Sequence, residues 1–123
     1  MLFRSLCEII FSQTVAGWTR IIDHYRGRDM GLEHYADILE ERAVQLGYRY
    51  GEHTGPHDLK VKEFGSGVTR LTRGQELGIA FRVLPNAPIQ DGIEQVRKML
   101  PKVVIDRTRG AAVVEALDNY RRK

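Results

Sequence analysis

The first quarter of the chain carries two runs of β-branched and aromatic residues with a short turn between them. Glu8–Thr14 and Trp18–Tyr25 have this composition, which is typical of strands, and residues 15–17 are enough to reverse the chain. The pattern therefore predicts an antiparallel hairpin. The apolar positions available to face a layer of helices are Ile9, Phe11, Ile21 and Tyr25.

Helical and strand patterns then alternate along the rest of the chain. Apolar residues recur at helical spacing from Leu32 to Leu46, and Gly47 ends this helix. Further helices are predicted over residues 68–77, 89–100 and 111–122, and short strands over residues 48–50, 79–84 and 103–105. A hairpin followed by alternating strands and helices predicts a single α/β domain over residues 1–123, with a mixed sheet and helices on its faces.

Composition narrows the class of protein without naming a function. A chain of 123 residues with 42% hydrophobic and 28% charged residues excludes a large multidomain enzyme, a disordered chain and a coiled coil. Cys7 is the only cysteine, so an internal disulfide is excluded; we expect it to be a small core residue. The sequence shows no signal peptide and no apolar run that would span a bilayer, so we expect a cytoplasmic protein with no membrane association.

Acidic residues that follow predicted strands are the candidates for chemistry, because ligands of open α/β sheets collect beyond the carboxyl ends of strands. Asp58 lies just after the strand predicted at residues 48–50, where its carboxylate would hold Mg²⁺ or Mn²⁺ shared with substrate phosphates. The alternative is that Asp58 only caps a turn or a helix start. His57 is a weaker metal candidate, since a loop histidine is more often solvated or hydrogen-bonded.

Other acids have adequate structural explanations. We expect Asp23 to be an exposed strand charge and Asp91 to favour the positive end of a helix dipole. Asp106 follows the last predicted strand and remains a second candidate acid.

The net charge of +3 permits a polyanionic partner without requiring one. If basic side chains from the predicted loops and helix starts converge, they form a groove that contacts the DNA backbone and not the bases. Scattered, solvated charges are the alternative. The candidate nucleic-acid contacts are Lys60, Lys62, Arg70, Arg73, Arg107 and Arg109.

Six stretches, in this order, resemble the C-terminal nuclease domain of tailed-phage terminase large subunits. They are IIFSQ, IIDHYRGRDMGLEHYADIL, GYRYGEHTGPHD, TRGQELGIAFRVLP, IQDGIEQVRKMLP and VIDRTRGAAVVEALDNYRR, and together they cover about residues 7–122. The most specific elements are the IDHY strand that leads to GLEHY, the PHD loop and the ALDNYRR helix.

The resemblance implies a ribonuclease-H-like fold and a metal-dependent endonuclease that cuts concatemeric viral DNA during packaging in a bacterial host. The implied partners are double-stranded DNA, the terminase small subunit and the portal. Asp58 matches one acid of the family's cluster, which would place Mg²⁺ or Mn²⁺ at this residue. The other two acids do not carry over, because the family's first strand and last helix have no counterpart here. The ATPase motor and its phosphate loop are also missing.

One aspartate and one histidine supply too few ligands for two-metal cleavage, so we expect a weak or inactive nuclease fragment. Loss of the first strand also predicts self-association through an exposed sheet edge. The alternatives are a non-catalytic module that binds DNA or a packaging partner, a relic with neither property, and an α/β domain of unrelated function.

Overall fold

The computed structural model of the chain describes residues 6–28, 30–55, 59, 68–85 and 89–121. Its contacts divide the chain into two compact units. Unit 1 comprises residues 1–29 and 88–123, and unit 2 comprises residues 30–87. Whether the whole chain is one domain remains a prediction.

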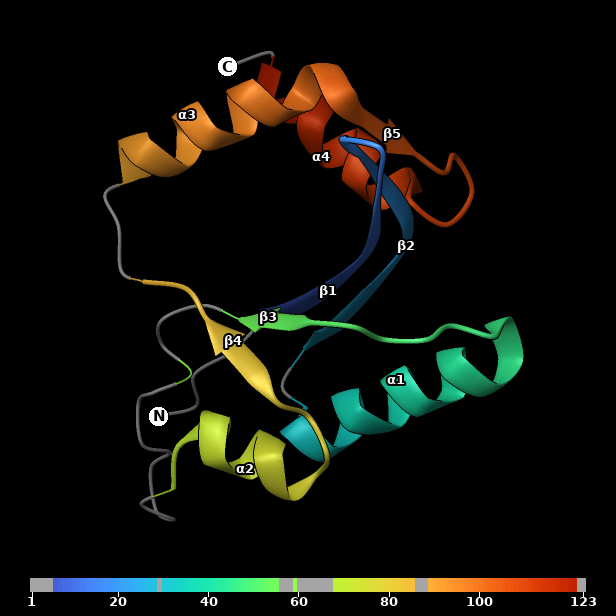
Figure 1. Cartoon of the computed structure of the whole chain (residues 1–123), viewed down its shortest axis with the longest axis vertical. Coiled ribbons are helices and arrows are strands. Elements are labelled where there is room, and N and C mark those ends of the chain that lie inside the picture. The colour runs from blue at the N-terminus through green and yellow to red at the C-terminus, as the bar shows by residue number, and fades with distance from the viewer. Residues whose placement is uncertain (1–5, 29, 56–58, 60–67, 86–88, 122–123) are drawn as a thin grey trace. The chain divides into compact units, whose positions relative to one another are not determined.

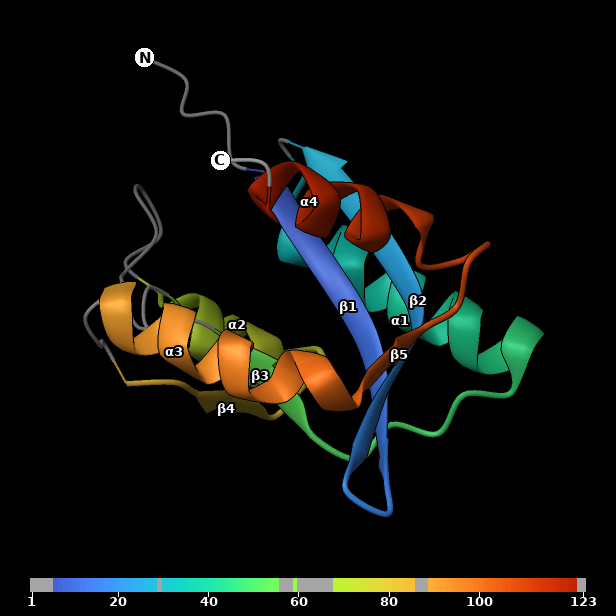
Figure 2. The same cartoon turned by 90° about the horizontal axis from the view of Figure 1, so that it is seen from above.

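Unit 1 is built on the predicted hairpin, which the structure confirms (Figure 1). β1 (Leu6–Val15) and β2 (Trp18–Arg28) pair antiparallel, and Figure 2 shows the two long strands side by side. The turn between them has positive φ angles at both central residues, 50° at Ala16 and 82° at Gly17. Two positive φ angles match the right-handed twist of the strands, and glycine adopts one at no steric cost.

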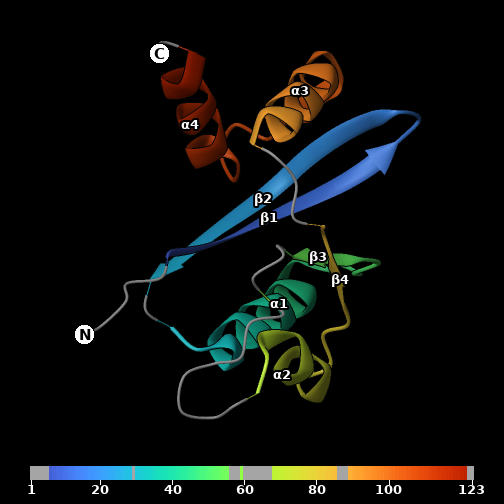
Figure 3. The same ribbon diagram turned by 90° about the vertical axis from the view of Figure 1, so that its left-hand side faces the viewer.

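The C-terminal part of the chain completes unit 1. It contains α3 (Ile89–Met99), a 3₁₀ turn (Leu100–Lys102), β5 (Val103–Ile105) and α4 (Ala111–Arg121). β5 pairs parallel with β2, so the sheet is mixed and has the order β1-β2-β5. Both helices of this unit lie on the same side of the hairpin (Figure 3).

A β-bulge decides which residues of the hairpin face the interior. The register shifts between Phe11 and Ser12, where β2 contributes the extra residue Ile22. If the register did not shift, Ile22 would lie opposite Phe11 and Asp23 opposite Ile10, which is 52% exposed. With the shift, Asp23 lies opposite Phe11, which is 6% exposed. Cross-strand partners point to the same side of a sheet, so the bulge moves the carboxylate to the inner face. The prediction that Asp23 is an exposed strand charge was therefore wrong, because this side chain is only 2% exposed.

Unit 2 contains α1 (Leu32–Leu46), β3 (His53–Gly55), α2 (Arg70–Glu76) and β4 (Phe81–Val83). β3 and β4 pair parallel, and both helices lie on one side of this strand pair (Figures 1 and 3). Its buried apolar residues are Tyr35, Leu59 and Ile79. Gly47 ends α1 as predicted, with a left-handed φ of 73° and its N–H donated to the carbonyl of Ala43.

The order of helices and strands predicted from the sequence is confirmed, and the bounds of two elements are corrected. The strand predicted at residues 48–50 is wrong, since β3 lies at His53–Gly55, and α2 is shorter than the predicted helix. The described strands form two separate sheets and not one. The coarse prediction of a mixed α/β protein is confirmed, while a ribonuclease-H-like arrangement remains a prediction. In the described part of the chain, no helix has the length and apolar character needed to cross a membrane.

Candidate functional site

Four of the predicted site residues lie outside the described residues. They are His57, Asp58, Lys60 and Lys62. Within the described ranges, no three His, Cys, Asp or Glu side chains come together in a way that could hold a metal ion. The two residues predicted to hold Mg²⁺ or Mn²⁺ lie outside these ranges, so the metal site at Asp58 stays a prediction.

Asp106, the second candidate acid, organises the loop between β5 and α4. Its Oδ1 atom accepts hydrogen bonds from the backbone N–H groups of Thr108 at 2.9 Å and Arg109 at 2.7 Å. Its backbone carbonyl accepts a third from the N–H of Gly110 at 2.8 Å. A carboxylate that binds successive backbone N–H groups has the role of a turn cap. The loop 106–110 is therefore held in one conformation at the start of α4.

Asp23 anchors the same loop to the sheet. One oxygen accepts the backbone N–H of His24 at 2.8 Å, and the other lies 3.6 Å from the Arg109 guanidinium. Arg109 is half-exposed while Asp23 is buried. Removing Arg109 would take this cation away from the buried Asp23 carboxylate, which is expected to be destabilising. The pair therefore connects the inner face of β2 to the segment that precedes α4.

Arg107 points to a different role for this loop. It is exposed, and it forms no ion pair with any residue that the structure describes. It lies between Asp106 and Thr108, whose backbone positions are fixed by the carboxylate cap. The first turn of α4 has no acidic residue of its own, and the nearest carboxylate in the preceding loop is that of Asp106. Asp106 already binds the backbone N–H groups of residues 108–110, so an anion at this loop would contact the Arg107 side chain.

Of the two predicted basic residues that the structure describes in unit 2, Arg73 has less freedom to contact a phosphate. Arg70 is exposed at the first residue of α2. Arg73 binds two carboxylates: its Nε donates to Glu33 at 2.9 Å, a second nitrogen also binds Glu33, and Nη1 lies 3.3 Å from Glu76. The hydrogen bond from Arg73 lowers the pKa of Glu33, and the same bond raises the pKa of Arg73. The charge of Arg73 is thus already compensated inside its own unit.

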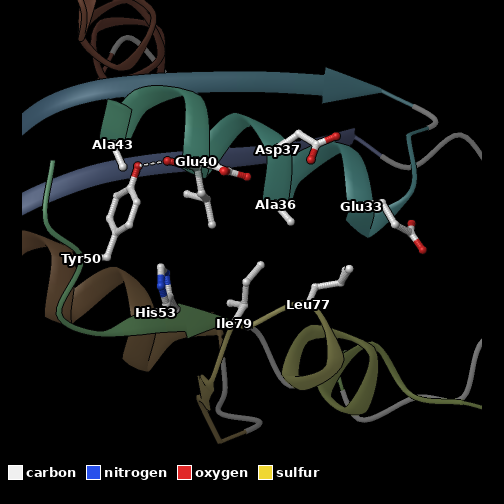
Figure 4. A pocket seen from close by; sticks show the side chains of 11 residues that line it. Glu33, Ala36, Asp37, Glu40, Ala43, Tyr50, His53, Leu77 and Ile79 are labelled. Atoms are coloured by element: carbon white, nitrogen blue, oxygen red, sulfur yellow. Dashed lines mark hydrogen bonds between the residues drawn. The ribbon is translucent and has the colours of Figure 1, made fainter. Parts of the chain in front are cut away.

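Unit 2 also contains a hollow of about 560 Å³ that the sequence pattern did not indicate. In Figure 4, Ala36 and Ala43 point from α1 toward an opposite wall. That wall is formed by Tyr50, His53, Leu77 and Ile79. The Tyr50 hydroxyl donates a 2.7 Å hydrogen bond to the carbonyl of Leu39, which closes one end.

The charge on the hollow decides what it is able to bind. Glu33, Asp37 and Glu40 of α1 line it, so its rim is negative and its walls are mainly apolar. A negative rim repels phosphate, which excludes this hollow as a DNA contact. The one signal in the sequence that would have located it is the pair of alanines on the apolar stripe of α1, since small side chains leave space against a neighbouring wall.

The structure therefore brings together only part of the predicted site. Arg107 and Arg109 share one loop of unit 1, and Arg70 and Arg73 share α2 of unit 2. The residues that sequence reasoning missed are the buried Asp23 and the lining of the hollow. No family model, curated protein or solved structure matches this chain.

Proposed function

We propose that the chain is part of a phage DNA-packaging terminase nuclease domain that keeps an affinity for double-stranded DNA and has little or no cleavage activity. The observation that carries this proposal is the order and spacing of the six resembling stretches between residues 7 and 122. The confirmed hairpin followed by alternating helices and strands is compatible with it. The family's metal chemistry would require Asp58 together with acids that have no counterpart in this sequence.

Nicking of supercoiled plasmid by the purified full chain tests the nuclease part of this proposal. With Mn²⁺ we expect slow nicking or none, and any nicking is expected to disappear in Asp58→Asn. Asp91→Asn is a matched control, because this exposed carboxylate lies in the first turn of α3. Rapid cleavage, or cleavage that Asp58→Asn leaves unchanged, would contradict the proposal.

A specific observation also favours the second candidate, a non-catalytic DNA-binding module. Unit 1 contains twelve Lys and Arg against eight Asp and Glu, whereas unit 2 contains seven against eight. The excess of positive charge is therefore confined to the unit that presents Arg107 in the capped β5–α4 loop. Phosphate contacts of this kind give affinity without sequence preference.

Substitution of Arg107 tests this loop as a phosphate contact. Arg107→Ala is expected to weaken binding equally for DNA duplexes of unrelated sequence. It should also reduce the slope of log affinity against log salt concentration by about one. Fluorescence anisotropy of a labelled duplex measures both. Arg49→Ala, an exposed arginine of unit 2, is the control and should change neither. Equal effects of the two substitutions would rule out the β5–α4 loop as the contact.

A further inference from the structure

Within the sheet that the structure describes in unit 1, β1 is an edge strand. It is ten residues long, and among the described strands it pairs only with β2. Natural sheets protect such edges with Pro, Lys, bulges or very short strands. β1 contains no Pro, Lys or Arg, and the extra residue of the bulge belongs to β2. None of these protective features of sequence or pairing therefore interrupts β1.

The one charged residue of β1 is neutralised within its own hairpin. Glu8 accepts a hydrogen bond from Arg26 Nε at 2.8 Å, forms an ion pair with Nη2 of the same side chain at 2.6 Å, and lies 3.7 Å from the His24 imidazole. This edge therefore offers no unpaired charge for a basic or an acidic peptide to bind. A neutral strand with matching apolar positions is the partner that it fits, and β1 itself is such a strand.

Of the two-fold registers centred on Ile9, Ile10 and Phe11, only the one about Ile10 sets the exposed Ile10 against an apolar residue. Antiparallel pairing about Ile10 places this residue opposite its own copy, Ile9 opposite Phe11, and Glu8 opposite Ser12. A shift by two residues in one direction sets Ile10 against Ser12, and a shift in the other sets it against Glu8. Cross-strand partners lie on the same face of a sheet. Pairing centred on Ile10 therefore extends the inner face with Ile9 and Phe11 of both copies. On the other face it covers Ile10, which is 52% exposed.

We propose that two copies of this chain associate through β1, antiparallel and centred on Ile10, to form one continuous sheet. The partner is a second copy because the edge is self-complementary in this register and carries no unpaired charge. This association is independent of the proposed DNA binding, which involves the β5–α4 loop. The competing possibility is that an unrelated extended peptide pairs with β1. The register centred on Ile10 distinguishes a second copy of the chain from such a peptide.

Disulfide trapping of the full chain tests the register. In a Cys7→Ser background, Ile10→Cys places two thiols opposite each other, within the Cα separation of about 7 Å that a disulfide spans. Ser12→Cys in the same background is the matched control, since its two copies are offset by four residues, or about 13 Å. We expect covalent dimer from Ile10→Cys under mild oxidation and little from the control. Equal yields from both variants would overturn the register and the proposal.

Sedimentation equilibrium tests the association without a cross-link. The unmodified chain is expected to be a dimer that dissociates on dilution, and Ile10→Lys to raise its dissociation constant by at least about tenfold, as a lysine at an edge opposes pairing. Ile10 is exposed, so the fold is expected to survive, which far-UV circular dichroism checks. A monomer at every concentration, or a dimer unaffected by Ile10→Lys, would overturn the proposal.

Discussion

At the scale of single residues, two aspartates that the sequence offers as surface or site acids serve the structure of one loop. Asp106 binds the N–H groups of Thr108 and Arg109, and Asp23 pairs with the Arg109 guanidinium from the buried face of β2. Both carboxylates are used to hold the segment before α4. The exposed Arg107 is thereby presented from a loop whose backbone is fixed at several points.

The cap formed by Asp106 is expected to contribute measurably to stability. Asp106→Ala removes the acceptor of two backbone hydrogen bonds and should lower the free energy of unfolding by about 1–2 kcal/mol. Asp106→Asn keeps an acceptor oxygen and should cost less. Asp118→Ala, an exposed residue of α4, is the control. Urea denaturation followed by circular dichroism measures the difference, and equal midpoints for the two alanine variants would refute the cap.

The ion pair between Glu33 and Arg73 predicts a small pH dependence. The pKa of Glu33 is lowered from its ordinary value of 4.5, mainly by the hydrogen bond from Arg73. A lowered pKa in the folded state contributes stability above the ordinary value, and this contribution is lost as the pH falls through the folded pKa. Both side chains are half-exposed, so salt should weaken the effect.

Arg73→Gln should therefore return the pKa of Glu33 toward 4.5, as measured by an NMR titration of its side-chain carboxyl carbon. Arg49→Gln is the control and should leave the titration unchanged. A titration of Glu33 that is the same with and without Arg73 would show that the ion pair does not form in solution.

At the scale of elements, the sequence predicted those features that depend on local chemistry. The hairpin turn, the glycine that ends α1 and the strand Val103–Ile105 follow from turn residues, a cap and a run of β-branched residues. The strand predicted at residues 48–50 failed because the affinity of aromatic residues for strands reflects packing. Here Tyr50 packs near Tyr48 and donates its hydroxyl to Leu39 of α1, so the strand begins only at His53.

The junction between β5 and α4 depends on a small residue. A Cβ atom on Gly110 would lie 2.5 Å from the Ile105 side chain and 2.7 Å from the backbone carbonyl of Asp106. Gly110→Ala should therefore lower the free energy of unfolding by about 1–3 kcal/mol, since the backbone must shift. Gly51→Ala is the control, because nothing lies within 4 Å of its added Cβ. Equal urea midpoints for the two variants would contradict this packing.

At the scale of the whole molecule, the sequence predicted the order of the elements but not how the strands join. Local patterns mark where strands occur, whereas the pairing of strands distant in sequence depends on long-range packing that they do not encode. The described strands therefore form a mixed sheet of β1, β2 and β5 and a separate pair of β3 and β4, where one sheet was expected. The bulge at Ile22, which buries Asp23, is likewise invisible to a pattern of alternating residues.

The candidate site was predictable only in part for the same reason. Arg107 and Arg109 were predicted as nucleic-acid contacts, but the division of charge between the two units becomes visible only once the chain is folded. The sequence marks Arg73 as a phosphate contact equal to the others, while in the structure Glu33 and Glu76 already compensate its charge. A charge in a sequence indicates a partner only after its neighbours are known.

The salt dependence of DNA binding by the intact chain tests the central claim most directly. The affinity for double-stranded DNA is expected to fall linearly with salt on logarithmic scales and to be the same for unrelated sequences, because counterions are released from phosphates that the basic residues of unit 1 contact. No binding at low salt, or an affinity that salt leaves unchanged, would contradict the account.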